Sequence, residues 1–114
     1  MSEISSINKF VILHNTSKLQ PVHGYEIVKT LKETGLATKA SSGGVYRILR
    51  ELEKDALIAS YWDLSSEGGP PSRKYEVTQS GKSYLNHLGG KMYLFASTLR
   101  FYAKDYALED TSGD

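Results

Sequence analysis

The chain of 114 residues contains no cysteine, which excludes disulfides, thiolate metal sites and cysteine nucleophiles together. It has no apolar run near the roughly 20 residues that are needed to span a bilayer. The N-terminal stretch MSEISSINKF lacks the basic segment followed by an apolar segment that is typical of a secretory signal. We therefore expect a cytoplasmic protein without a membrane partner.

An excess of charge of one sign is also missing. The 14 Lys and Arg residues balance 13 Asp and Glu residues, so the net charge is only +1. A protein that coats nucleic acid regardless of sequence is usually far more basic. The balance does not exclude nucleic-acid binding, because binding depends on where the cationic residues lie. Hydrophobic residues make up 39% of the chain, which is enough for the core of a single domain.

Patterns for catalysis and metal binding are absent from the sequence. His14, His23 and His87 do not have the spacing of metal ligands. There is no Ser–His–Asp set, no pair of carboxylates and no HExxH motif, and the lysine and serine of a phosphate-binding loop do not follow Gly68-Gly69. We expect no enzymatic activity, no metal site and no cofactor.

Hydrophobic spacing predicts two helices in the first third of the chain. The first ends near residues 15–18 and has apolar or aromatic side chains at helical spacing: Ile4, Ile7, Phe10, Val11 and His14. The second follows Pro21, and its predicted apolar side consists of Tyr25, Ile27, Val28 and Leu31. Gly35 is a suitable stop for this helix, because glycine adopts the left-handed conformation without strain.

A third helix, predicted over residues 42–55, has two distinct faces. At about 100° per residue, four aliphatic side chains fall within one arc of roughly 100°: Val45, Ile48, Leu49 and Leu52. Arg47, Arg50 and Lys54 cluster on the opposite side, and Tyr46 lies at the boundary. A soluble helix has a polar outer face in any case, so the basic face by itself does not indicate DNA binding.

Strand-forming residues follow this helix. The stretches IASYWDL (58–64) and KYEVT (74–78) flank a segment rich in glycine and proline, which predicts a β-hairpin with a long tip. Tyr75 and Val77 are predicted to lie on one face of the second strand. Three helices followed by a hairpin predict a winged helix-turn-helix, a mainly α fold of the α+β class.

A long last helix is predicted to begin near Ser80, with Thr78 as its cap. Its apolar residues step by three and four through three heptads: Leu85, Leu88, Met92, Phe95, Leu99, Tyr102 and Tyr106. Gly89 and Gly90 interrupt this seam and indicate a kink or a close helix crossing. A seam of this length exceeds what one small three-helix body covers, so we expect it to pack against the same helix of a second copy. The alternative is that it folds back on the first helix of its own chain.

These elements give a domain plan. Residues 1–79 are expected to form the winged helix-turn-helix domain, 80–108 the C-terminal dimerisation helix, and 109–114 a disordered tail. No linker or repeat divides the chain.

Three stretches together resemble the PadR family of transcriptional regulators: HGYEIVKTL (23–31), SSGGVYRILRELEKDALI (41–58) and EGGPPSRKYEVTQSGKSYL (67–85). The resemblance covers about residues 20–85, and the short C-terminal part is similar to the small PadR subgroup with a single C-terminal helix. Four features depart from the family pattern: Ser42 replaces proline, Gly44 replaces threonine, Asp55-Ala56 replaces Glu-Gly, and Ser72 is inserted before Arg73. The resemblance implies a homodimeric repressor, which in some members releases DNA when a small molecule binds.

As the third helix of such a fold, residues 42–55 are expected to enter the major groove. Arg47 and Arg50 would contact guanine edges or phosphates there. Around them we expect residues that hold phosphate or permit a close backbone approach: Lys39, Ser41, Ser42, Gly43, Gly44 and Tyr46. A half-buried structural role is the alternative for Tyr46.

The wing, residues 66–74, is expected to place Arg73 and Lys74 on the DNA backbone or in the minor groove. Pro70 and Pro71 would stiffen its tip. His23 and Tyr25 of the HGY motif complete the predicted DNA-binding set. For His23, packing or helix capping is the alternative.

The predicted partners are double-stranded DNA and a second copy of the chain. A two-fold dimer would present its recognition helices to a palindromic site about 34 Å apart. A small-molecule effector among the aromatic residues of the last helix is a further hypothesis, and simple packing is the commoner role of such residues. Two rival functions remain open, a winged helix that docks a partner protein and a ligand-sensing dimer. Steep salt dependence would indicate DNA binding, and quenching of Trp62 would indicate a ligand.

Overall fold

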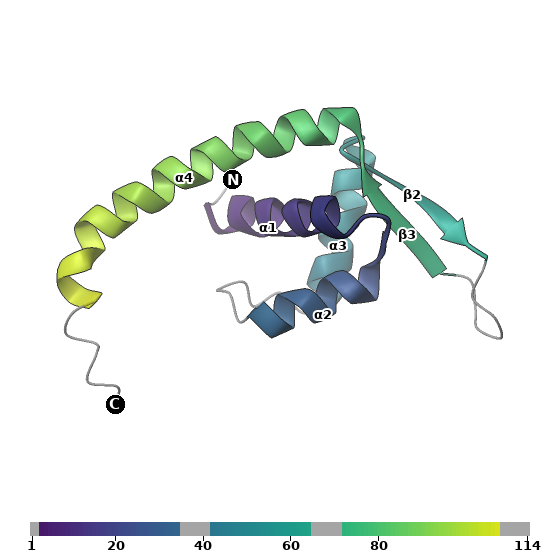
Figure 1. Cartoon of the computed structure of the whole chain (residues 1–114), viewed down its shortest axis with the longest axis horizontal. Helices are drawn as coiled ribbons and strands as arrows, with labels where there is room; N and C mark the ends of the chain where they lie inside the picture. The colour runs from purple at the N-terminus through teal and green to yellow at the C-terminus, as the bar shows by residue number, and fades with distance from the viewer. Residues whose placement is uncertain (1–2, 35–41, 65–71, 108–114) are drawn as a thin grey trace.

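The computed structural model describes residues 3–34, 42–64 and 72–107. Its elements follow in the order α1 (Glu3–Leu19), β1 (Val22–His23), α2 (Gly24–Thr34), α3 (Ser42–Lys54), β2 (Ile58–Asp63), β3 (Ser72–Val77) and α4 (Gln79–Ala107). In Figure 1 the β2–β3 hairpin projects to one side of a body made of α1, α2 and α3, while α4 runs beside α1 and curves beyond it. The predicted winged helix-turn-helix is confirmed. Gly35, the wing tip at 65–71 and the predicted tail at 109–114 lie outside the described residues.

The core lies between the three helices and one face of the sheet. Its α3 members are the four aliphatic residues predicted from the spacing: Val45, Ile48, Leu49 and Leu52. The prediction for α1 was less accurate, because Ile12 and Leu13 are its fully buried apolar residues while His14 is exposed. The reason is that α1 contacts α4 as well as α2, α3 and β3. Apolar residues therefore occur around much of the helix, and their spacing does not single out one face.

The sheet has three strands, although the sequence predicts two. β3 is central and pairs antiparallel with both β2 and the two-residue strand β1. Val22 lies opposite Tyr75 on one edge, and Ser60 lies opposite Tyr75 on the other. A two-residue strand is too short to show a period of two, which explains why the sequence did not predict β1. Tyr75 and Val77, which were predicted to lie on one face of this strand, are both buried.

The end of α3 has a left-handed cap. The Leu57 N–H donates to the Leu52 carbonyl (2.9 Å) and the Ala56 N–H to the Glu53 carbonyl (3.0 Å), which is the Schellman pattern. Ala56 has φ = 62°, a left-handed conformation that usually requires glycine. Glycine is common at this position in the pattern that the sequence resembles, so the alanine adds backbone strain here.

The start of α4 is attached to this cap. The Thr78 hydroxyl accepts a hydrogen bond from the Gly81 N–H (3.0 Å) and donates one to the Ala56 carbonyl (2.7 Å). The predicted capping role of Thr78 is therefore confirmed. A Cβ at Gly81 would overlap the Leu57 carbonyl oxygen, so only glycine permits this close approach. The contacts fix the direction in which α4 leaves the domain.

α4 continues without a break through Gly89 and Gly90. A Cβ at Gly89 would lie 3.4 Å from the ring of Phe10, whereas a Cβ at Gly90 would meet nothing within 4 Å. Gly89 therefore lies where α4 packs against α1. Among the described helices, none combines the length and hydrophobicity needed to cross a membrane.

We predict that Ala56→Gly raises the free energy of unfolding by roughly 1 kcal/mol, because relief of the left-handed strain exceeds the entropy that glycine adds to the unfolded chain. Urea denaturation followed by circular dichroism measures the change. Ala59→Gly, in the exposed part of β2, is the matched control and should lower stability. Equal loss of stability in both variants would contradict the strained cap.

Candidate nucleic-acid interface

The orientation of α3 is set by its buried side. Val45 and Leu49 are fully buried, and Ile48 and Leu52 nearly so. Because this side is fixed in the core, the opposite side, with Arg47, Arg50 and Lys54, is exposed to solvent. The predicted separation of an apolar and a basic face is confirmed.

Arg47 forms an ion pair on the surface of α3. Its Nη1 lies 3.3 Å from Oε2 of Glu51, four residues later; the Arg47 side chain is 63% exposed and the Glu51 side chain 43%. Such a pair contributes only about 0.3–0.5 kcal/mol. The guanidinium can therefore exchange this carboxylate for an acceptor on DNA at little cost.

Tyr46 lies where α3 meets the start of α2. Its ring packs against the core cluster and is half-buried, so the structural role weighed for it is present. A Cβ at Gly24 would overlap the ring edge of Tyr46, which explains the glycine of the HGY motif. The sequence did not identify this contact, because Gly24 and Tyr46 are 22 positions apart.

Tyr75 lies between α3 and the wing. Burial raises the pKa of its phenol above the ordinary value of 10.0, and the nearby carboxylate of Glu53 raises this pKa further. The guanidinium groups of Arg73 and Arg50 act in the opposite direction. The phenol is therefore close to charged groups of both predicted DNA-contacting elements.

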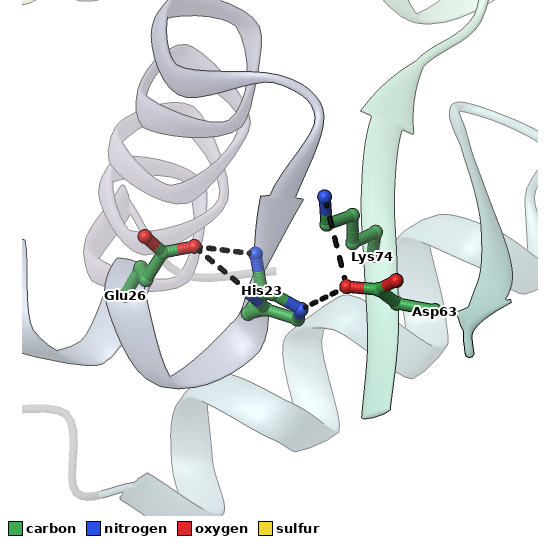
Figure 2. A network of polar contacts seen from close by, with 4 residues as sticks. All are labelled: His23, Glu26, Asp63 and Lys74. Carbon is green, nitrogen blue, oxygen red and sulfur yellow. Dashed lines mark hydrogen bonds and ion pairs between the residues drawn. The ribbon is translucent and has the colours of Figure 1, made fainter. Parts of the chain in front are cut away.

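Figure 2 shows a polar network at the base of the wing. The His23 ring contacts two carboxylates, with Nδ1 3.2 Å from Glu26 Oε1 and Nε2 3.1 Å from Asp63 Oδ2. Lys74 Nζ lies 3.7 Å from the same Asp63 oxygen. The network connects the start of α2 to both strands of the hairpin.

The backbone of His23 supports the capping alternative that its sequence position left open. Its N–H donates to Glu26 Oε1 (2.9 Å), which is one half of a capping box. The three-residue spacing from His23 to Glu26 could have predicted this bond. The contact with Asp63 spans 40 positions and has no local sequence signal.

Tyr25 is not part of the apolar side of α2, and that part of the prediction was wrong. It is 60% exposed and its ring stacks on His23, with centroids 5.3 Å apart. Tyr25 is the second residue of α2, and its side chain points in a different direction from the buried side chains of Ile27, Val28 and Leu31. Tyr25 is therefore available at the surface beside the wing base.

The two cationic residues of the wing both have partners within the protein. The guanidinium of Arg73 lies 4.7 Å from the centroid of the Trp62 ring, donates from Nη1 to Ser60 Oγ (2.5 Å) and lies 3.9 Å from Glu53 Oε2. Lys74 has Asp63 as its partner. The sequence did not identify these partners. Ser60, Trp62 and Asp63 reach the cations through the pairing of β2 with β3, and Glu53 through the packing of α3 against β2.

The remaining predicted residues are in the first turn of α3 or precede this helix in the sequence. α3 begins at Ser42, and Gly43 is exposed in its first turn. Lys39 and Ser41 lie outside the described residues. Within the part of the chain that the structure describes, no cluster of three or more His, Cys, Asp or Glu residues could hold a metal ion.

Comparison with family models identifies the chain. The model of the transcriptional regulator PadR-like family matches residues 12–87, from the middle of α1 into α4. The chain belongs to the PadR-like family. Members of this family are DNA-binding transcriptional regulators and not enzymes. A comparison with curated proteins finds none that matches.

Solved structures of PadR-like proteins have the same fold. A PadR-like transcription factor from Bacteroides fragilis is 28% identical, with a TM-score of 0.67 over 83% of this chain and 88% of that one. A PadR-like regulator from Bacillus cereus is 25% identical, with a TM-score of 0.74 over 87% and 93%. A transcriptional regulator from Thermoplasma acidophilum, also 25% identical, has a TM-score of 0.76 over 90% and 97%. The similarity extends over nearly the full length of these relatives.

We predict an alkaline loss of stability that depends on Tyr75. Because the pKa of Tyr75 is raised in the folded state, the folded protein holds the phenol proton more strongly than the unfolded chain does. The resulting contribution to the free energy of unfolding is present below about pH 10 and is lost as the pH rises further. Tyr75→Phe should flatten the fall in unfolding free energy above pH 10, measured by urea denaturation. Tyr93→Phe changes an exposed ring and is the control. An unchanged pH profile for Tyr75→Phe would refute the assignment.

Proposed function

We propose that this PadR-like regulator is a homodimeric repressor that binds a palindromic operator. α3 enters the major groove, where Arg47 and Arg50 contact base edges, while the N–H groups at the start of α3 hold phosphate. The observation that supports this proposal best is the exposed basic face of α3, directly opposite a fully buried face. Lys39, Ser41, Ser42 and the Tyr46 hydroxyl are the proposed phosphate contacts around it.

The wing is the second proposed contact with DNA. Arg73 and Lys74 lie on the hairpin next to α3, and Arg73 is 43% exposed despite its contacts within the protein. Their place in the hairpin supports a role on the backbone or in the adjacent minor groove. His23 and the exposed Tyr25 extend this surface toward the start of α2.

The distal half of α4 supports a dimer. Of the predicted seam, Leu88 is buried and Leu85 partly buried against the chain's own core, whereas Leu99, Tyr102 and Tyr106 are exposed. This half extends beyond α1 in Figure 1. The fold-back alternative therefore accounts for the proximal half of the seam only, and a second copy of α4 is the simplest cover for the rest. Met92 and Phe95 complete the proposed dimer seam.

The exposed aromatic residues of α4 also support an effector site in the dimer, as a second and separate hypothesis. Tyr93, Phe101, Tyr102 and Tyr106 are all more than half exposed. Trp62 is the second-last residue of β2, and in Figure 1 β2 lies on the opposite side of the molecule from the distal half of α4. Thermal stability in the presence of small aromatic compounds is therefore the better assay, because Trp62 quenching would not report on α4.

Fluorescence anisotropy at two salt concentrations tests the main proposal, using the DNA upstream of the gene and a scrambled duplex. We expect tight binding that weakens steeply with salt and prefers the native duplex. No binding to either duplex at low salt would contradict the proposal and favour a partner protein. Equal, weak binding to the native and the scrambled duplex would show that the basic face contacts only phosphate.

Arg50→Ala should separate base contacts from phosphate contacts. We expect specific binding to weaken by roughly 10- to 100-fold, because a good base contact contributes about 1–3 kcal/mol, and non-specific binding to change much less. Lys54→Ala, at the end of the same exposed face, is the matched control. Equal losses on native and scrambled duplexes would show that Arg50 contacts only phosphate.

Leu99→Glu should weaken the dimer at least tenfold, because it buries a carboxylate in the seam. The same change at Leu94, which is also exposed but lies about 140° away around α4, is the control. Sedimentation velocity across a dilution series measures both dissociation constants. A larger effect at Leu94 would place the interface on the other face of α4.

A further inference from the structure

We propose that Glu53, Ser60 and Trp62 are positioning residues for DNA binding, which hold the wing residue Arg73 in a fixed orientation beside α3. Together with Arg73 they are called the wing clamp below. The inference rests on the proposed function, in which Arg73 contacts the DNA backbone. It adds three residues that do not themselves need to contact DNA.

The pairing of β2 with β3 places the three hairpin members of the wing clamp, Ser60, Trp62 and Arg73, on the face of the sheet that continues the core. Directly opposed residues of antiparallel strands share a face, and the opposed pairs on this face are Ile58 with Val77, Ser60 with Tyr75, and Trp62 with Arg73. Ile58, Tyr75 and Val77 are buried in the core beside α3. Arg73 therefore leaves the sheet on the same side as α3, and not on the side of Lys74.

A chain of hydrogen bonds connects Arg73 to α3 through Ser60. Arg73 Nη1 donates to Ser60 Oγ, and the same hydroxyl donates its proton to Glu53 Oε2 (2.6 Å). The hydroxyl is thus used both as acceptor and as donor, which fixes its rotation. Glu53 belongs to the last turns of α3, so the chain joins the proposed recognition helix to both strands of the wing.

The Trp62 ring contacts the same guanidinium. The 4.7 Å distance to the ring centroid is within the range of a cation–π contact. A guanidinium has five N–H donors in a planar fork, and the clamp hydrogen bond uses Nη1. Arg73 can therefore remain in the wing clamp and donate to a phosphate at the same time.

The expected benefit is preorganisation. A free arginine side chain loses much of its rotamer freedom when it binds, and this loss weakens affinity. In the wing clamp this freedom is already restricted before DNA arrives. The wing angle relative to α3 is restricted as well, since the contacts cross from helix to hairpin.

Ser60→Ala tests the wing clamp without changing any charge. We expect affinity to fall about fivefold, the effect of one net hydrogen bond, with an unchanged salt slope. In the Arg73→Ala background, the same substitution should have almost no further effect. Ser83→Ala, on the exposed surface of α4, is the matched control and should leave affinity unchanged in both backgrounds.

Glu53→Ala provides a second test in which the sign of the effect is informative. Removal of a carboxylate near DNA should tighten binding on charge alone, and we expect this result in the Arg73→Ala background. With Arg73 present, loss of the wing clamp should instead weaken binding. Tighter binding in both backgrounds would overturn the role of Glu53.

Two outcomes separate failure of this inference from failure of the wing contact. If Arg73→Ala lowers affinity on all duplexes and reduces the salt slope by about one, but Ser60→Ala has no effect or an additive one, the wing clamp is overturned and the wing contact stands. If Arg73→Ala changes neither affinity nor slope, both are overturned. Trp62 is the only tryptophan, so a shift of its emission in free Ser60→Ala, with an unchanged melting midpoint, would support the wing clamp before DNA is added.

Discussion

The burial of one side of α3 is the constraint on which the proposed interface depends. Val45, Ile48, Leu49 and Leu52 occupy the centre of the core, and their packing leaves α3 no freedom to rotate about its axis. The outward direction of Arg47 and Arg50 is a consequence of that packing. A near-neutral chain can in this way present a local basic surface, because the position of each cation is set by the core.

The central strand β3 has the corresponding role for the wing. Tyr75 and Val77 of this strand lie in the core, whereas Arg73 and Lys74, nearer its start, lie toward the outer end of the hairpin. Alternation along the strand sends these two cations to opposite faces. Arg73 meets Trp62, Ser60 and Glu53 on one face, whereas Lys74 meets Asp63 and lies near His23 on the other. The wing cations are therefore part of ordered networks before any DNA is bound.

The two halves of α4 differ in their surroundings. Its first half is anchored through Thr78 and Gly81 to the end of α3 and crosses α1 at Gly89. Its second half has an apolar surface that the chain itself leaves exposed. Because α4 is one uninterrupted helix, a second subunit bound to its distal half would have a fixed position relative to the end of α3. This arrangement links the spacing of the two recognition helices to the packing of the proposed seam.

The sequence by itself determined the order of the four helices and the two hairpin strands, the two faces of α3, the cap at Thr78 and the family resemblance. Each of these depends on local spacing, which the positions of apolar, glycine and capping residues record. The tertiary structure alone decided that Ile12 and Leu13 are the buried centre of α1, that Tyr25 faces solvent, and that Val22–His23 forms a third strand. It also decided which carboxylates accompany the cations, since His23 and Asp63 are 40 positions apart. Contacts of this kind arise when separate elements pack, and spacing along the chain contains no record of which side chains then meet.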